Sequence, residues 1–106
     1  MLFRSKADIV TDAKTTYLVK NGHPMMTQVV GTGCMATSVI GAFAAVEADL
    51  TLAAACALAC YEIAAEVAAD TASGPASFKQ GLFDCLYGLD RQTVERMQRI
   101  EVFSSN

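Results

Sequence analysis

The sequence is poor in positive charge and lacks the patterns of several common functional classes. It holds eight Lys and Arg against eleven Asp and Glu, a formal net charge of -3, and its basic residues form no cluster beyond Arg96 and Arg99. Because nucleic-acid binding needs concentrated positive charge, no nucleic-acid partner is expected. The absence of Gly-Lys-Ser and Gly-Lys-Thr excludes a Walker A loop. The first residues lead into no apolar core of signal-peptide length.

The cysteines lack both the loop-rich surroundings of a disulfide scaffold and the spacing of a zinc ribbon. The four cysteines are Cys34, Cys56, Cys60 and Cys85, and they lie mostly within apolar helical patterns. Cys56 and Cys60 share a helix face, but two soft ligands without a further Cys or His nearby make a poor zinc site. We therefore expect reduced core cysteines, no metal ligands on this chain, and a cytoplasmic location.

Apolar residues dominate what is present. They make up 53% of the 106 residues, and the mean hydropathy is +0.33. The length suits one small domain, spanning residues 1–106. So short a chain would ordinarily expose more polar surface, so we expect its helices to be covered by a partner subunit or by a missing part of the same protein. The domain is thus expected to be partial.

A membrane partner is not expected, although residues 21–46 carry no formal charge. Gly and Pro interrupt this segment, and its unbroken apolar helix is shorter than the ~20 residues that a bilayer requires. A later helical segment carries Glu62 and Glu66 in its body.

The local patterns predict an α/β arrangement with an N-terminal β-hairpin, three to four helices and a final strand. The third helix begins at Pro75, Asp90 caps a short fourth helix, and Thr51 is the expected N-cap of the second. The expected strands are 7–12, 15–19 and 99–103. The first two helices are expected at 34–46 and 52–70, with an extended segment at 25–30 leading to the first of them. Helix 34–46 should be buried nearly all round. Three strands are too few for such apolar helices, so the sheet is expected to be completed by residues that this chain lacks.

The stretch that organises the chain is Val29-Val30-Gly31-Thr32-Gly33-Cys34, followed by the apolar helix. A glycine-rich turn that feeds a helix leaves backbone N–H groups without partners, at the positive end of the helix dipole. This arrangement suits an anion such as phosphate. Cys34 falls in the first turn, where the same field favours the thiolate.

Two other interpretations of this turn stay open. The first is a simple tight bend, with Cys34 as a small buried residue at the helix start. Gly31-Thr32-Gly33-Cys34-Met35-Ala36 also fits the dinucleotide pattern G-x-G-x-x-A. That pattern requires a second strand after the helix, whereas a second helix is expected here.

The remaining polar candidates have ordinary structural explanations. His23 lies in a proline-containing turn and is expected to form loop hydrogen bonds rather than to act as a base. Glu62 and Glu66 are expected to form a solvated or interface stripe. Asp8 and Asp12 are expected at the surface of the hairpin, although either could approach a nucleotide.

The segment Asn21-Gly22-His23-Pro24 through Gly31-Thr32-Gly33-Cys34 resembles the C-terminal part of hydroxyethylthiazole kinase, in the ribokinase-like superfamily. Gly74-Pro75-Ala76-Ser77-Phe78 and Ile100-Glu101-Val102 are similar to the same family. Sibling kinases usually carry Asp where Cys34 stands. One departure is Arg4, which occupies the place of a nucleotide-contacting Thr, so that contact is not carried over.

The resemblance implies a ribokinase-like α/β fold and transfer of a phosphoryl group from ATP, with Mg²⁺, to the hydroxyl of 4-methyl-5-(2-hydroxyethyl)thiazole in thiamine biosynthesis and salvage. It also implies a homo-oligomer, a trimer with active sites at subunit interfaces. Gly31 matches the substrate-contacting glycine. The amides of Gly31, Thr32, Gly33 and Cys34 match the anion hole, and Cys34 matches the catalytic residue beside the acceptor hydroxyl.

Two alternative functions follow from the same residues. One is an inactive truncated remnant that acts as an oligomerisation or anion-binding module. The other is a different ribokinase-like kinase, which Cys34 in place of Asp disfavours.

Overall fold

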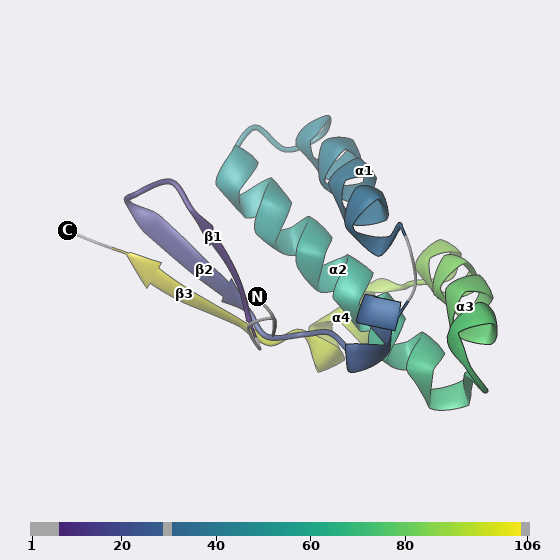
Figure 1. The fold of residues 1–106 in the computed structure, drawn as a ribbon. Coiled ribbons are helices and arrows are strands. Elements are labelled where there is room, and N and C mark those ends of the chain that lie inside the picture. Colours follow the sequence, from purple (N-terminus) through teal and green to yellow (C-terminus); the bar gives the residue numbers. More distant parts are fainter. Residues whose placement is uncertain (1–6, 29–30, 105–106) are drawn as a thin grey trace.

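A computed structural model describes residues 7–28 and 31–104 of the chain. Figure 1 shows a long central helix, α2, with a small sheet on one side and two helices, α1 and α3, on the other. In chain order the elements are β1 (Asp8–Thr11), β2 (Thr15–Val19), the 3-10 helix η1 (Pro24–Gln28), α1 (Thr32–Ala44), α2 (Leu50–Thr71), α3 (Pro75–Tyr87), α4 (Arg91–Met97) and β3 (Ile100–Ser104). The predicted hairpin, four helices and final strand are therefore all present.

The sheet is antiparallel, with the order β1-β2-β3. Tyr17 of β2 pairs with Val10 on one side and with Val102 on the other, so the last strand returns to the first hairpin. The hairpin turn is built on Asp12, whose Oδ1 accepts hydrogen bonds from the amides of Lys14 (2.9 Å) and Thr15 (2.8 Å). These backbone bonds favour the carboxylate and hold the pKa of Asp12 below its ordinary value.

Helix α2 is the core of the fold because small side chains line it on several sides. One buried cluster joins Tyr61 to Phe78 and Leu82 of α3, and a second joins Ala55 and Ala59 to Val19 of the sheet. Alanines allow neighbouring backbones to come close. By length and composition α2 could cross a membrane, but it packs against both sheet and helices, as a core helix does.

Three predicted details of the chain path are wrong. Helix α1 spans residues 32–44 rather than 34–46. The segment expected to be extended at 25–30 forms η1 over residues 24–28, where Thr27 Oγ1 donates to the carbonyl of Pro24 at 2.8 Å; residues 29–30 lie outside the described ranges. Helix α2 begins two residues earlier than expected. Its N-cap is Asp49, not Thr51, because the Asp49 carboxylate accepts from the amide of Leu52 at 3.1 Å.

Helix α1 is not buried all round, contrary to prediction. Met35, Ala36 and Val39 pack against the α2–α3 cluster, whereas Gly33 and Gly41 on the other side are exposed. The physical reason is that the described chain provides α1 with one close helical neighbour, α2, and nothing over its outer face (Figure 1). The predicted starts of the later helices are confirmed: Pro75 opens α3, and Asp90 caps α4 by accepting from the amide of Thr93 at 2.8 Å.

Candidate active site

Gly31 sets the geometry of the turn that starts α1. Its φ of +96° lies in the left-handed region, which glycine adopts without a steric penalty. Its carbonyl accepts the first helical bond, from the amide of Met35 at 2.9 Å. The amides of Thr32, Gly33 and Cys34 therefore belong to the first turn, where no intrahelical carbonyl is in reach. As the N-cap, Gly31 also offers no side chain to cap them.

The turn is open to solvent on the side where a ligand would sit. Gly33 and Cys34 are exposed, and a Cβ added at Gly31 or Gly33 would meet nothing within 4 Å among the described residues. The first turn of α1 also carries no acidic residue, so no carboxylate within that turn neutralises the positive end of the dipole. This geometry suits an anion.

A cavity of about 330 Å³ adjoins the turn. The residues that line it come from four elements: Asp8, Met26, Thr27, Gly33, Ala36, Leu58, Tyr61 and Glu62. Gly33 thus shares one cavity with two carboxylate residues, Asp8 and Glu62. Glu62 is only 3% exposed, so the prediction that it belongs to a solvated or interface stripe is wrong. Asp8 is half-buried in this cavity, whereas Asp12 remains exposed in its turn.

Cys34 differs from the other three cysteines in its surroundings. All four are free thiols, as predicted, but Cys34 is exposed, whereas the others are partly buried. Burial is the main cause that raises the pKa of the Cys56, Cys60 and Cys85 thiols above the ordinary value. Those three are therefore neutral packing residues at neutral pH. Cys34, at the start of α1, is therefore the most exposed of the four thiols.

The turn that contains His23 behaves as predicted. The imidazole Nδ1 accepts a hydrogen bond from the amide of Met25 at 3.1 Å, and the His23 carbonyl accepts from the amide of Met26 at 3.0 Å. Both bonds shape the start of η1. His23 is a loop residue and is not among the residues that line the cavity.

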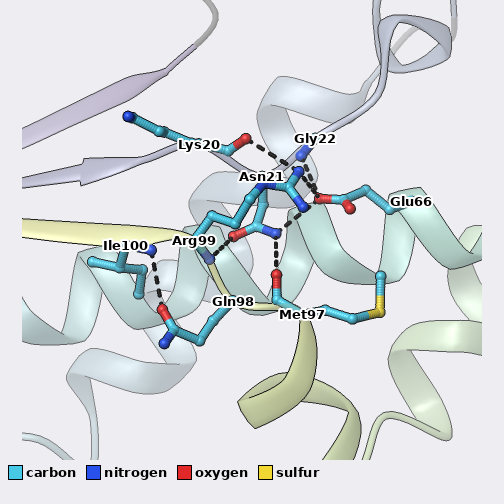
Figure 2. A network of polar contacts seen from close by, with 8 residues as sticks. All are labelled: Lys20, Asn21, Gly22, Glu66, Met97, Gln98, Arg99 and Ile100. Atoms are coloured by element: carbon cyan, nitrogen blue, oxygen red, sulfur yellow. Dashed lines mark hydrogen bonds and ion pairs between the residues drawn. The ribbon is translucent and has the colours of Figure 1, made fainter.

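Glu66 is the centre of a polar network that the sequence did not predict. Its Oε2 accepts from Asn21 Nδ2 (2.9 Å), from the Gly22 amide (2.8 Å) and from Arg99 Nη2 (3.1 Å) (Figure 2). Its side chain is 15% exposed, so Glu66 is not part of a solvated stripe either. The partners lie 45, 44 and 33 residues away along the chain, and no local pattern signals such distant pairs.

The described residues do not form a metal centre by themselves. Within residues 7–28 and 31–104, no group of three or more His, Cys, Asp or Glu side chains is placed to hold an ion. The cavity brings together only two carboxylate residues, Asp8 and Glu62. The described side chains therefore do not form a Mg²⁺ site by themselves.

The fold and the glycine turn define the class to which the chain belongs. A solved structure titled hydroxyethylthiazole kinase protein from Pyrococcus horikoshii OT3 matches it with a TM-score of 0.87 and 35% identity, over 95% of this chain and 39% of that one. The fold is a C-terminal fragment of a ribokinase-like α/β fold, as predicted. The sequence model of the hydroxyethylthiazole kinase family matches residues 1–92, so the chain belongs to that family.

Curated relatives agree with this assignment. A hydroxyethylthiazole kinase of Desulfatibacillum aliphaticivorans is 48% identical over 93% of this chain and 37% of the relative. One from Roseiflexus castenholzii is 53% identical over 88% of this chain and 34% of the relative. A third, from Methanosarcina mazei, is 43% identical over 95% and 39%. The chain thus spans little more than a third of the length of the curated relatives it matches.

Proposed function

We propose that this chain takes part in the ATP-dependent phosphorylation of the hydroxyl of 4-methyl-5-(2-hydroxyethyl)thiazole, in the thiamine pathway of the cytoplasm. The observation that carries the proposal is the exposed start of α1, where the backbone amides of the first helical turn lie beside a cavity. Membership of the hydroxyethylthiazole kinase family supplies the reaction class.

In this proposal the amides of Gly31, Thr32, Gly33 and Cys34 donate hydrogen bonds to the phosphoryl group in transit. Phosphoryl transfer depends mainly on alignment and on stabilising charge at the phosphoryl oxygens. Fixed backbone donors at a helix N-terminus provide both without rearrangement during the reaction. By resemblance to the family, Gly31 would also contact the thiazole.

Cys34 is placed beside the acceptor hydroxyl in the same proposal. The alcohol oxygen attacks the γ-phosphorus, the bond from that phosphorus to the bridging oxygen of ATP breaks, and ADP leaves. The Cys34 thiolate takes the hydroxyl proton. Because the transition state is loose, a strong base is not required, and alignment of the hydroxyl is the larger part of the role.

ATP would bind with its γ-phosphate at the turn, and Mg²⁺ would neutralise charge on the phosphates. The carboxylates gathered in the described part of the chain are too few for a dedicated metal cage, so the ion would be carried largely by the nucleotide. By resemblance to the family, contacts to the adenine would come from residues outside this chain, which spans 37% of the Desulfatibacillum relative.

A homo-oligomer, a trimer by resemblance to the family, is part of the proposal. Its support is the apolar surface that the described residues leave open, including Val46, Leu50, Phe83 and Tyr87. Such surface is usually covered in the working assembly. Neither nucleic acid nor a membrane is proposed as a partner.

The specific alternative is an inactive remnant that binds anions or self-associates. It is favoured by the share of the relatives' length that the chain lacks. The test is formation of thiazole phosphate from ATP, Mg²⁺ and the thiazole alcohol, with the chain alone and after mixing with the N-terminal two-thirds of the Desulfatibacillum relative. Steady turnover in either case supports the kinase and rejects the remnant. No turnover in both, with phosphate binding intact, supports the remnant.

A further inference from the structure

We propose that Glu66 is a positioning residue for the glycine turn, acting through the loop formed by Asn21 and Gly22. Glu66 lies on α2 and touches none of the proposed reacting groups. The inference deepens the proposed function, and only its turnover measurement rests on that function. Its first readout, phosphate binding at the turn, does not require catalysis.

The bonds to Glu66 converge on a single oxygen. Oε2 accepts from the side chain of Asn21, from the backbone of Gly22 and from Arg99, all within 2.8 to 3.1 Å (Figure 2). Hydrogen bonds to a charged acceptor are stronger than neutral ones. One carboxylate therefore fixes both a side chain and the main chain of the loop.

Asn21 spreads this constraint to a third element. It is 4% exposed, its Nδ2 also donates to the carbonyl of Met97 at 2.9 Å, and its Oδ1 accepts from the amide of Arg99 at 2.9 Å. The end of α4 and the start of β3 are thus tied to the same loop. Gly22 has a φ of +130°, so it takes a conformation that glycine allows, and its N–H is directed to Glu66.

The Asn21–Gly22 loop is connected to the glycine turn through α2, because the elements before and after that turn both pack against this helix. After Gly22 the chain enters η1, whose Met26 is buried in the cluster built on Tyr61 of α2. Met35 and Ala36, just after the turn, pack against that same cluster. The segments before and after Gly31 therefore both rest on the helix that carries Glu66. Release of the loop would shift η1 relative to α1 and so displace the amides at the start of α1.

The experiment compares Glu66→Ala and Glu66→Gln in the full chain with a matched control, Glu101→Ala. Glu101 also forms an ion pair, with Lys20 at 2.6 Å, but both side chains of that pair are exposed, and its loss leaves the three bonds to Glu66 Oε2 in place. The readout is the rate of Cys34 alkylation by iodoacetamide and its suppression by inorganic phosphate, measured well below the melting temperature of each variant.

We expect Glu66→Ala to need roughly tenfold more phosphate for the same suppression, since small displacements of binding groups are costly. Glu66→Gln keeps an acceptor oxygen for the loop and should recover most of the effect. Glu101→Ala should behave as the unmodified chain. A loss of stability alone would lower the melting temperature without changing suppression by phosphate in the folded state.

If Glu66→Ala does not fold, Asn21→Asp decides, because it keeps the size of the side chain but replaces a donor with a charge that repels Glu66. Suppression equal to that of the unmodified chain in Glu66→Ala, or in Asn21→Asp where Glu66→Ala does not fold, overturns the proposal. The turnover assay adds a second readout: a fall in kcat of about 10- to 100-fold with a smaller change in the KM for ATP. Phosphate suppression without any turnover in the unmodified chain would count against the proposed function and leave the role of Glu66 standing.

Discussion

The amide of Gly22 donates to Oε2 of Glu66 at 2.8 Å, which ties the core helix to the loop that leads toward the glycine turn. Glu66 is on α2, and α1 packs against the same helix. The loop before the candidate site and the helix after it are therefore both supported by α2. The precision of the site depends on a carboxylate that has no direct role in the chemistry proposed.

The thiols should differ in reactivity in a way that identifies Cys34. Burial raises the pKa of Cys56, Cys60 and Cys85, so their reactive thiolates form only at more alkaline pH than for an ordinary thiol. Brief iodoacetamide treatment at neutral pH should therefore label Cys34 first, as mass spectrometry of peptides would show. Labelling of the other three should rise as the pH increases above the ordinary thiol range of about 8.5. Equal labelling of all four at neutral pH in the folded chain would contradict this assignment.

Replacement of Cys34 should affect turnover more than substrate binding. In the chain, or in its complex with the N-terminal part of a relative, Cys34→Ala should lower kcat by about 100-fold, within the range of a lost proton acceptor. Thiazole affinity, measured by calorimetry, should change little, because a methyl group leaves the amides in place. Cys34→Ser, which keeps a polar group at the same point, is the matched control and should retain more activity. Normal turnover of Cys34→Ala would refute the catalytic role.

The two glycines of the turn should respond differently to alanine. Gly31→Ala forces a side chain into the left-handed region and should destabilise the fold by about 1–2 kcal/mol. Gly33 lies inside α1, and a Cβ there meets no described atom within 4 Å, so Gly33→Ala should be neutral or stabilise by about 0.5 kcal/mol. Urea unfolding of both variants tests the contrast. Equal losses of stability would show that Gly33 has a conformational requirement that its position in the helix does not explain.

The start of α2 should depend on Asp49 and much less on Thr51. Asp49→Ala removes the acceptor for the Leu52 amide and should lower the free energy of unfolding by about 1 kcal/mol. Thr51→Ala removes no cap and should cost less. Thermal or urea unfolding gives both numbers, and a larger loss from Thr51→Ala would reverse the assignment of the N-cap.

Local signals in the sequence were sufficient for most of the fold. Pro75 opens α3 and Asp90 caps α4 as predicted, because each effect involves atoms within one helical turn. The same kind of signal misplaced the cap of α2, since Asp49 and Thr51 are both residues that are favoured at N-caps. Only the path of the backbone decides which carboxylate or hydroxyl meets an amide.

The parts of the site that depend on tertiary contacts were not predictable. Glu62 and Glu66 stand one turn apart on an alanine-rich helix, a spacing typical of a polar stripe, yet both carboxylates point into the fold. Their burial results from the sheet and loop that pack against α2, whose residues are distant in sequence. The exposed face of α1 was missed for the opposite reason: an apolar pattern predicts burial but does not say whether the covering residues belong to the chain.

The most direct test of the anion-binding turn is an ¹⁵N–¹H NMR titration of the chain with inorganic phosphate. The account predicts that the amide resonances of Gly31, Thr32, Gly33 and Cys34 shift most and follow one binding curve. It would be contradicted if these four resonances stayed unchanged while phosphate moved others.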